Sequence, residues 1–122
     1  MSDDGIDWKT VDSILLISSR DKQLMPELIN LFKESSSQNI LDIKRSISLR
    51  NLREIKNFAH ALKSVCNSIG AKRARELADA VESVTPDFNT KDVLQIVENL
   101  ENEIGRNIIA LTFFVESRGL RS

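Results

Sequence analysis

The sequence has 122 residues, of which 41% are hydrophobic, 29% charged and 5% aromatic, and its formal net charge is −1. This length is typical of one domain that buries roughly two-thirds of its unfolded surface, and the composition is typical of a soluble globular protein. No apolar run approaches the roughly 20 residues of a membrane span, and the acidic start lacks a secretory signal region. We therefore expect one cytoplasmic domain over residues 1–122, with a disordered lead-in at residues 1–6.

Apolar residues recur every three or four positions along most of the chain, which predicts amphipathic helices rather than strands. Pro26 suits the first turn of the second helix, so that helix should start at Leu24 or Met25. Suitable N-terminal caps precede several helices, and Gly70 suits a left-handed C-terminal position. The expected helices cover residues 7–18, about 22–48, 51 to near 70, 71–84 and 90 to about 117, with Asp7, Asn51 and either Asn89 or Thr90 as caps. Helical periodicity along the chain predicts an all-α fold. The short loops between the four long helices should place neighbouring helices antiparallel, which predicts an antiparallel up-and-down four-helix bundle with an additional short N-terminal helix.

Each helix should bury its apolar stripe and expose the opposite face. The acidic residues of the last helix fall outside its expected seam, so we expect Glu98, Glu101 and Glu103 on a solvated face. The stripes expected for the first two helices are Trp8, Val11, Ile14, Leu15 and Ile17, then Leu24, Leu28, Leu31, Phe32, Ile40, Ile43 and Ile47.

The only histidine, His60, lies near the middle of the third expected helix. On that helix the apolar stripe consists of Leu52, Ile55, Ala59, Leu62, Cys66 and Ile69. His60 is one step of about 100° from Ala59, so it should face water on the polar side. The same polar side carries Arg53, Lys56, Asn57, Lys63, Ser64 and Asn67. Cys66, the single cysteine, cannot form an internal disulfide and should be a buried structural thiol.

Most catalytic chemistries are excluded by the residues available. The four glycines are isolated, which excludes a glycine-rich phosphate loop, and one cysteine with one histidine is too few for a zinc site. A catalytic triad needs a carboxylate that orients the histidine, and the nearest acid along the chain, Glu54, lies on another face. A solvent-facing imidazole is mostly neutral at cellular pH, so His60 itself remains as a nucleophile toward a transferable group. Lys63 and Ser64 lie one turn further along, where an ammonium can neutralise a phosphoryl group.

Charge is distributed unevenly along the chain. Residues 44–75 carry nine basic side chains against Glu54 alone, whereas residues 76–104 carry eight acidic side chains against Lys91 alone. His60 lies in the basic segment. We expect the basic segment to attract an anionic partner, although charges of both signs can also merely solvate helix surfaces.

The segment Ala59-His60-Ala61-Leu62-Lys63-Ser64, followed by Ile69-Gly70-Ala71, resembles the signature of histidine-containing phosphotransfer (HPt) domains. That signature has alanine-histidine, a variable residue, leucine-lysine, a small residue, and glycine-alanine starting ten residues after the histidine. The similarity extends to Asn51, to Leu28–Ser35 and to Leu77–Glu82, and covers residues 24–84. Ser64 departs from the pattern, because glycine is commonest there.

The resemblance implies that His60 accepts a phosphoryl group on Nε2 from a receiver-domain phosphoaspartate and passes it to another receiver aspartate. Lys63 would stabilise the phosphoryl charge, and Arg53, Lys56, Asn57, Ser64 and Asn67 would contact the partner. The partners would be receiver domains of response regulators or of hybrid histidine kinases. The protein would be a monomeric intermediate without kinase activity of its own, free-standing or part of a hybrid sensor kinase. It would need no cofactor, because the receiver brings magnesium and an acidic pocket.

Two other functions are compatible with the sequence. A helical adaptor would bind a receiver or kinase domain without being phosphorylated. A nucleic-acid binder would use the basic segment, but that segment contains only Phe58 among aromatic residues, on the apolar side, and has no helix-turn-helix break. We therefore expect no nucleic-acid partner.

Overall fold

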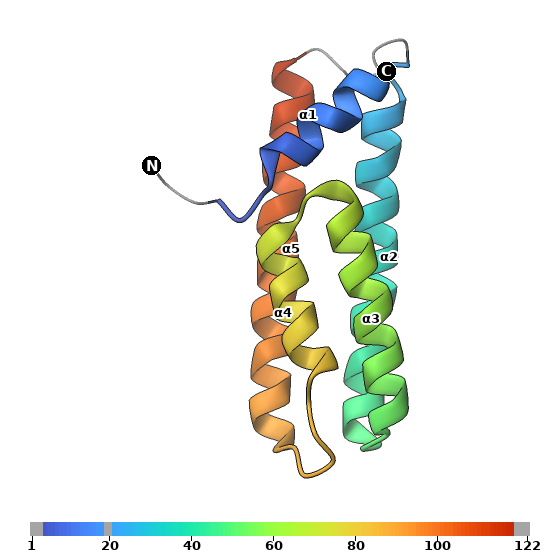
Figure 1. Cartoon of the computed structure of the whole chain (residues 1–122), viewed down its shortest axis with the longest axis vertical. Helices are drawn as coiled ribbons and strands as arrows, with labels where there is room; N and C mark the ends of the chain where they lie inside the picture. Colours follow the sequence, from blue (N-terminus) through green and yellow to red (C-terminus); the bar gives the residue numbers. More distant parts are fainter. Residues whose placement is uncertain (1–3, 19–20, 119–122) are drawn as a thin grey trace.

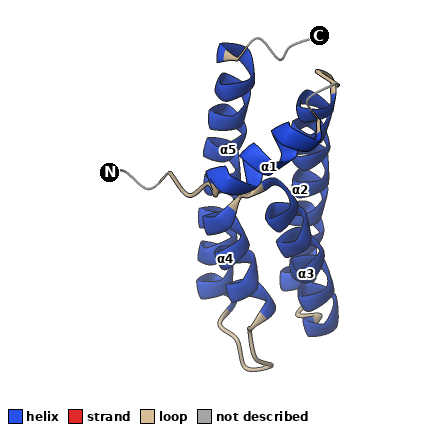
Figure 2. Ribbon diagram, turned by 45° about the horizontal axis from the view of Figure 1, so that its top comes forward, coloured by secondary structure: helices blue, strands red, loops and turns tan. Residues whose placement is uncertain are grey.

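The computed structural model describes residues 4–18 and 21–118. These residues form five helices and no strand, which confirms the all-α class (Figures 1 and 2). The helices are α1 (Trp8–Ile17), α2 (Leu24–Ser48), α3 (Leu52–Ile69), α4 (Lys72–Glu82) and α5 (Thr90–Ser117). None of the helices in these ranges is both long and apolar enough to cross a membrane.

The four helices α2 to α5 contact one another in a closed circuit. Each consecutive pair is in contact, and α5 also packs against α2. The shorter helix α1 crosses one end of this group (Figure 1), where it contacts α3. Its Trp8 ring lies 5.1 Å from the ring of Phe114 on α5. This arrangement encloses one core, built mainly from aliphatic side chains.

Local capping signals explain where most helices begin and end. The side chains of Asp7, Asn51 and Asn89 each accept a hydrogen bond from a backbone N–H in the first turn of the helix that follows. Helix α2 starts at Leu24, as Pro26 predicts. Helix α4 is shorter than expected at both ends, and its N-cap Ala71 offers no side-chain bond.

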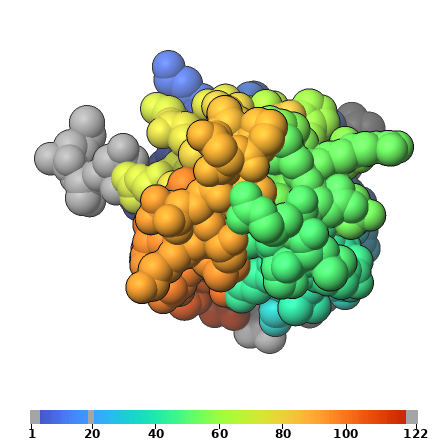
Figure 3. Space-filling model, turned by 90° about the horizontal axis from the view of Figure 1, so that it is seen from below, coloured from blue at the N-terminus to red at the C-terminus, as the bar shows by residue number. Residues whose placement is uncertain are grey.

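At the opposite end of the molecule, which Figure 3 shows from below, the connection between α2 and α3 lies beside the start of α5, and Arg50 links the two. Arg50 follows α2 with a left-handed backbone, φ 51°. Its guanidinium lies 4.0 Å from the centre of the Phe88 ring and donates hydrogen bonds to Thr90 Oγ1 and the Phe88 carbonyl, both at 3.0 Å. One side chain thus joins the connection between α2 and α3 to the loop between α4 and α5.

Three expectations about burial are wrong. Leu31 is 58% exposed and Ile17 is 83% exposed, because both lie beside the stripes that their helices bury. Glu103, expected on the solvated face of α5, is fully buried. Arg106 Nη2 approaches Glu103 Oε1 at 2.8 Å, and Asn107 Nδ2 donates to Oε2 at 3.0 Å. The hydrogen bonds to these partners compensate for the free-energy cost of removing the Glu103 carboxylate from water.

The expectation of a disordered lead-in is wrong for residues 4–6, while residues 1–3 lie outside the described part of the chain. Ile6 is 8% exposed and belongs to the core. The Gly5 carbonyl accepts a hydrogen bond from the Arg73 N–H at 3.1 Å, and the Asp7 N–H donates to the Gly70 carbonyl at 2.7 Å. The N-terminal segment therefore packs against the connection between α3 and α4.

Gly70 is required at this connection both for its conformation and for its lack of a side chain. Its φ is +80°, and an added Cβ would lie 2.8 Å from the Asp7 carbonyl oxygen. Gly70→Ala should therefore destabilise the fold by at least about 1–2 kcal/mol. Gly105, in the interior of α5, has open space around it, so Gly105→Ala should stabilise the fold by about 1 kcal/mol. Urea unfolding measures the change in the free energy of unfolding for each variant. A loss of stability in both variants, or in neither, would contradict this explanation.

Candidate functional site

Helix α3 buries the predicted stripe and exposes His60. Ile55, Ala59, Leu62 and Cys66 are all fully buried, whereas the His60 side chain is 63% exposed. This confirms the face assigned to His60 from the sequence. The histidine also lies near the middle of α3, well away from both ends of the helix.

Cys66 is a structural thiol, as predicted. Burial raises its pKa to about 12, so the thiol stays protonated near neutral pH and is a poor nucleophile. Within the described ranges, no group of three or more His, Cys, Asp or Glu side chains is placed to hold a metal ion.

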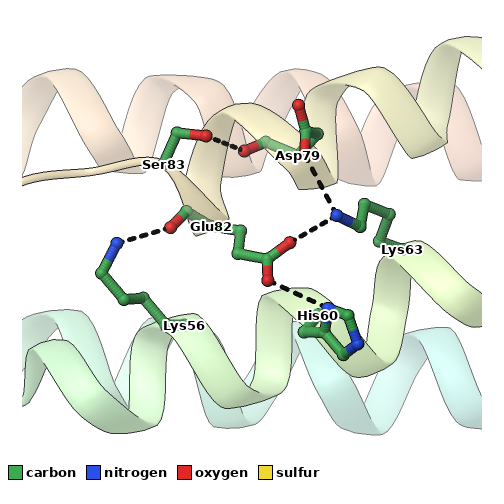
Figure 4. Close-up of polar contacts among 6 residues, drawn as sticks. All are labelled: Lys56, His60, Lys63, Asp79, Glu82 and Ser83. Carbon is green, nitrogen blue, oxygen red and sulfur yellow. Dashed lines mark hydrogen bonds and ion pairs between the residues drawn. The ribbon is translucent and has the colours of Figure 1, made fainter.

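Glu82, the last residue of α4, makes the closest polar contact to the histidine (Figure 4). Its Oε2 lies 2.9 Å from His60 Nδ1. An ionised carboxylate can only accept hydrogen bonds, so Nδ1 must carry the proton. In the neutral ring the lone pair is then on Nε2, which Figure 4 shows on the side of the ring away from Glu82. The contact therefore selects the tautomer that presents Nε2 as the nucleophile.

Lys63 shares the same carboxylate. Its Nζ lies 2.7 Å from Glu82 Oε1 and 3.1 Å from Asp79 Oδ1. The hydrogen bonds to Glu82 and then to Asp79 raise the pKa of Lys63. In return, the Lys63 bond is the main cause that lowers the pKa of the Glu82 carboxyl, with a smaller contribution from His60. Glu82 is therefore ionised at neutral pH, as the orientation of the His60 ring requires.

The family model of the Hpt domain matches residues 27–110. The match covers more than half of the chain, from α2 into α5. This chain belongs to the Hpt domain family. Comparisons with curated proteins and with solved structures gave no match. Family membership assigns this Hpt domain to phosphotransfer in two-component signalling, the function that the resemblance at His60 implied.

Sequence reasoning missed Glu82 and Asp79 in this Hpt domain. It considered only Glu54 as an acid near His60, and it expected no carboxylate to orient the ring. That expectation is wrong, because the short turn after α3 returns α4 along α3 and brings Glu82 to the histidine from 22 positions further on. The sequence of α4 did contain a signal, because Asp79 and Glu82 are three residues apart, on one side of the helix, and enclose Ala80 and the buried Val81.

The predicted partner-binding residues of the Hpt domain divide into two groups. Arg53, Asn57, Ser64 and Asn67 are exposed on α3. Lys56 differs, because it is only partly exposed and its Nζ donates to the Glu82 carbonyl at 2.7 Å. Ser64 and Asn67 border a hollow between α3 and α4, together with Lys63, Arg75, Glu76 and Asp79.

Pairing across helices neutralises part of the basic segment of the Hpt domain. Lys44 pairs with Glu101 at 2.9 Å, and Arg73 lies 3.6 Å from Glu103. With Lys63 held by Asp79 and Glu82, three of the nine basic residues face acids of the second segment. The positive electrostatic potential around His60 is therefore weaker than the distribution of charged residues along the sequence alone indicates.

Proposed function

We propose that this Hpt domain is a phosphorelay intermediate that accepts a phosphoryl group on His60 Nε2 and passes it on. The observation that carries the proposal is the 2.9 Å contact between His60 Nδ1 and Glu82 Oε2 on an exposed imidazole. A carboxylate that fixes the Nδ1 proton leaves Nε2 free to attack, and it also compensates for the positive charge that develops on the ring.

The proposed transfer needs no group from the Hpt domain other than the ring and its neighbours. The Nε2 lone pair attacks the phosphorus of a receiver phosphoaspartate. An N–P bond forms while the bond between phosphorus and the aspartate oxygen breaks, and the aspartate leaves as a carboxylate. In the second step the carboxylate of another receiver attacks phosphorus, and the bond to Nε2 breaks. Nδ1 keeps its proton and its contact with Glu82 throughout.

Lys63 is proposed to stabilise the phosphoryl group after transfer. In the resting protein its ammonium is paired with Glu82 and Asp79. A phosphoryl group on His60, one turn away, would compete with these carboxylates for the same charge. Lys63 would then exchange at least one carboxylate contact for a phosphoryl oxygen.

The partner proposed for this surface is a receiver domain of a response regulator or a hybrid kinase, which would bring magnesium and the reacting aspartate. Arg53, Asn57, Ser64 and Asn67 are exposed around His60 on α3 and are available for this contact. We also propose that α2 to α5 form the antiparallel up-and-down bundle, that the domain is monomeric without kinase activity, and that it acts in the cytoplasm. The alternating direction of these helices along the long axis in Figure 1 supports the bundle.

Transfer between labelled and unlabelled receivers tests the proposal. A panel of receiver domains is phosphorylated on aspartate with radiolabelled acetyl phosphate, freed of donor and mixed with the protein. We expect the protein to gain a label that is labile in acid and stable in base, and a second receiver to remove it. Stable binding of a receiver without any labelling would contradict the proposal and favour the adaptor function instead.

A further inference from the structure

Lys56 makes an interhelical contact at the end of α4. Its Nζ lies 2.7 Å from the carbonyl oxygen of Glu82, the last residue of that helix. The last carbonyls of a helix have no partner within the helix, and a cation near them is favourable. Helix α4 has no basic residue in its own last turn, so Lys56 of α3 supplies this charge from outside.

Glu82 is thereby held through both its backbone and its side chain (Figure 4). Lys56 contacts the carbonyl, and Lys63 contacts Oε1 at 2.7 Å. The remaining oxygen, Oε2, meets His60 Nδ1 at 2.9 Å. Lys56, His60 and Lys63 lie at successive turns of one face of α3, so the end of α4 is fixed against the same face that presents the histidine.

We infer that Lys56 is a positioning residue for His60 that acts through Glu82, and not a residue that binds the partner. Without the Lys56 contact, the last turn of α4 loses the interaction that holds its backbone against α3, and only the side-chain contacts of Glu82 remain. The Glu82 carboxylate then reaches Nδ1 less often, and the ring more often places its proton on Nε2, where it blocks attack. The effect on phosphotransfer rests on the proposed function, whereas the effect on the tautomer does not.

The tautomer of His60 is the measurement that separates positioning from partner binding or general stability. The nitrogen shifts of the ring in the ¹⁵N-labelled protein, recorded without a partner at a pH where the ring is neutral, report which nitrogen carries the proton. We compare the wild type with Lys56→Met, which keeps the apolar stem, and with Lys56→Arg, which keeps a charged donor. Lys33→Met is the matched control, because Lys33 is exposed on α2.

We expect the wild type and Lys56→Arg to hold the proton mainly on Nδ1, as should the control. Lys56→Met should move a measurable fraction to Nε2 and slow phosphoryl acceptance from a phosphorylated receiver by roughly tenfold, the scale of a small misplacement of a reacting group. Lys56→Gln, tested in the same way, replaces the methionine variant if that variant does not fold.

An unchanged tautomer in folded Lys56→Met would overturn the inference, even if phosphotransfer slowed, because Lys56 would then act at the partner surface. A tautomer shift of the same size in Lys33→Met would overturn it as well. If the wild type took no label from any receiver, the proposed function would fail, but the tautomer comparison would still decide the role of Lys56.

Discussion

Replacing His60 with glutamine is expected to abolish phosphoryl acceptance completely while leaving the fold intact. His60 is the only histidine in the chain, and Cys66, a possible alternative nucleophile, is buried and protonated. The His60 side chain is 63% exposed, so its replacement should change the free energy of unfolding by no more than about 0.5 kcal/mol. Labelling by a phosphorylated receiver, followed by a thermal melt of the same sample, checks both parts.

Asn30→Gln is a suitable control for this variant, because Asn30 is exposed on α2 and should be labelled like the wild type. Receiver binding should persist in His60→Gln, since the surrounding polar face of α3 is unchanged. Acid-labile label on His60→Gln at the level of the control would show that another residue accepts the phosphoryl group.

Replacing Glu103 with alanine is expected to have the largest effect on stability, a loss of about 2–4 kcal/mol from a cavity and a buried amide left without its partner. Glu103 is fully buried, and Asn107, also fully buried, donates to its Oε2 at 3.0 Å. Removing the carboxylate leaves this amide without its partner, whereas the Arg73 and Arg106 side chains, which are 40% and 66% exposed, can be solvated by water. Urea unfolding at neutral pH measures the loss.

Glu98→Ala is the matched control for Glu103→Ala, because Glu98 lies on the same helix and is exposed. We expect its free energy of unfolding to stay within about 0.5 kcal/mol of the wild type. Equal losses in the two variants would contradict the role given to the buried carboxylate and would indicate a general effect of charge on α5.

Local signals account for what the sequence predicted well. Asn51 caps α3 and Gly70 ends it, and neither feature depends on distant residues. Burial of the α3 stripe then fixes the exposed face, which is why the position of His60 could be predicted. The HPt-like spacing around His60 supplied the chemistry, and the family match agrees with it.

The incorrect predictions concern contacts between helices and small errors in helix register. Leu31 precedes the buried Phe32, and a shift of one residue, about 100°, is enough to turn it to the solvent. Glu103 was assigned to the solvated face because it falls outside the seam of apolar residues on its helix, and its partner Arg73 is thirty positions earlier in the chain. Glu82 reaches His60 only because α4 folds back on α3, a geometry that helical periodicity does not contain.

Locating the phosphoryl group after transfer from a phosphorylated receiver is the most direct test of the central claim. The protein is labelled with ¹⁵N in its histidine and examined by phosphorus and nitrogen NMR immediately after transfer. We predict that phosphorus is bonded to Nε2 of His60 while Nδ1 keeps its proton beside Glu82. A phosphoryl group on Nδ1, or on any residue other than His60, would contradict the claim.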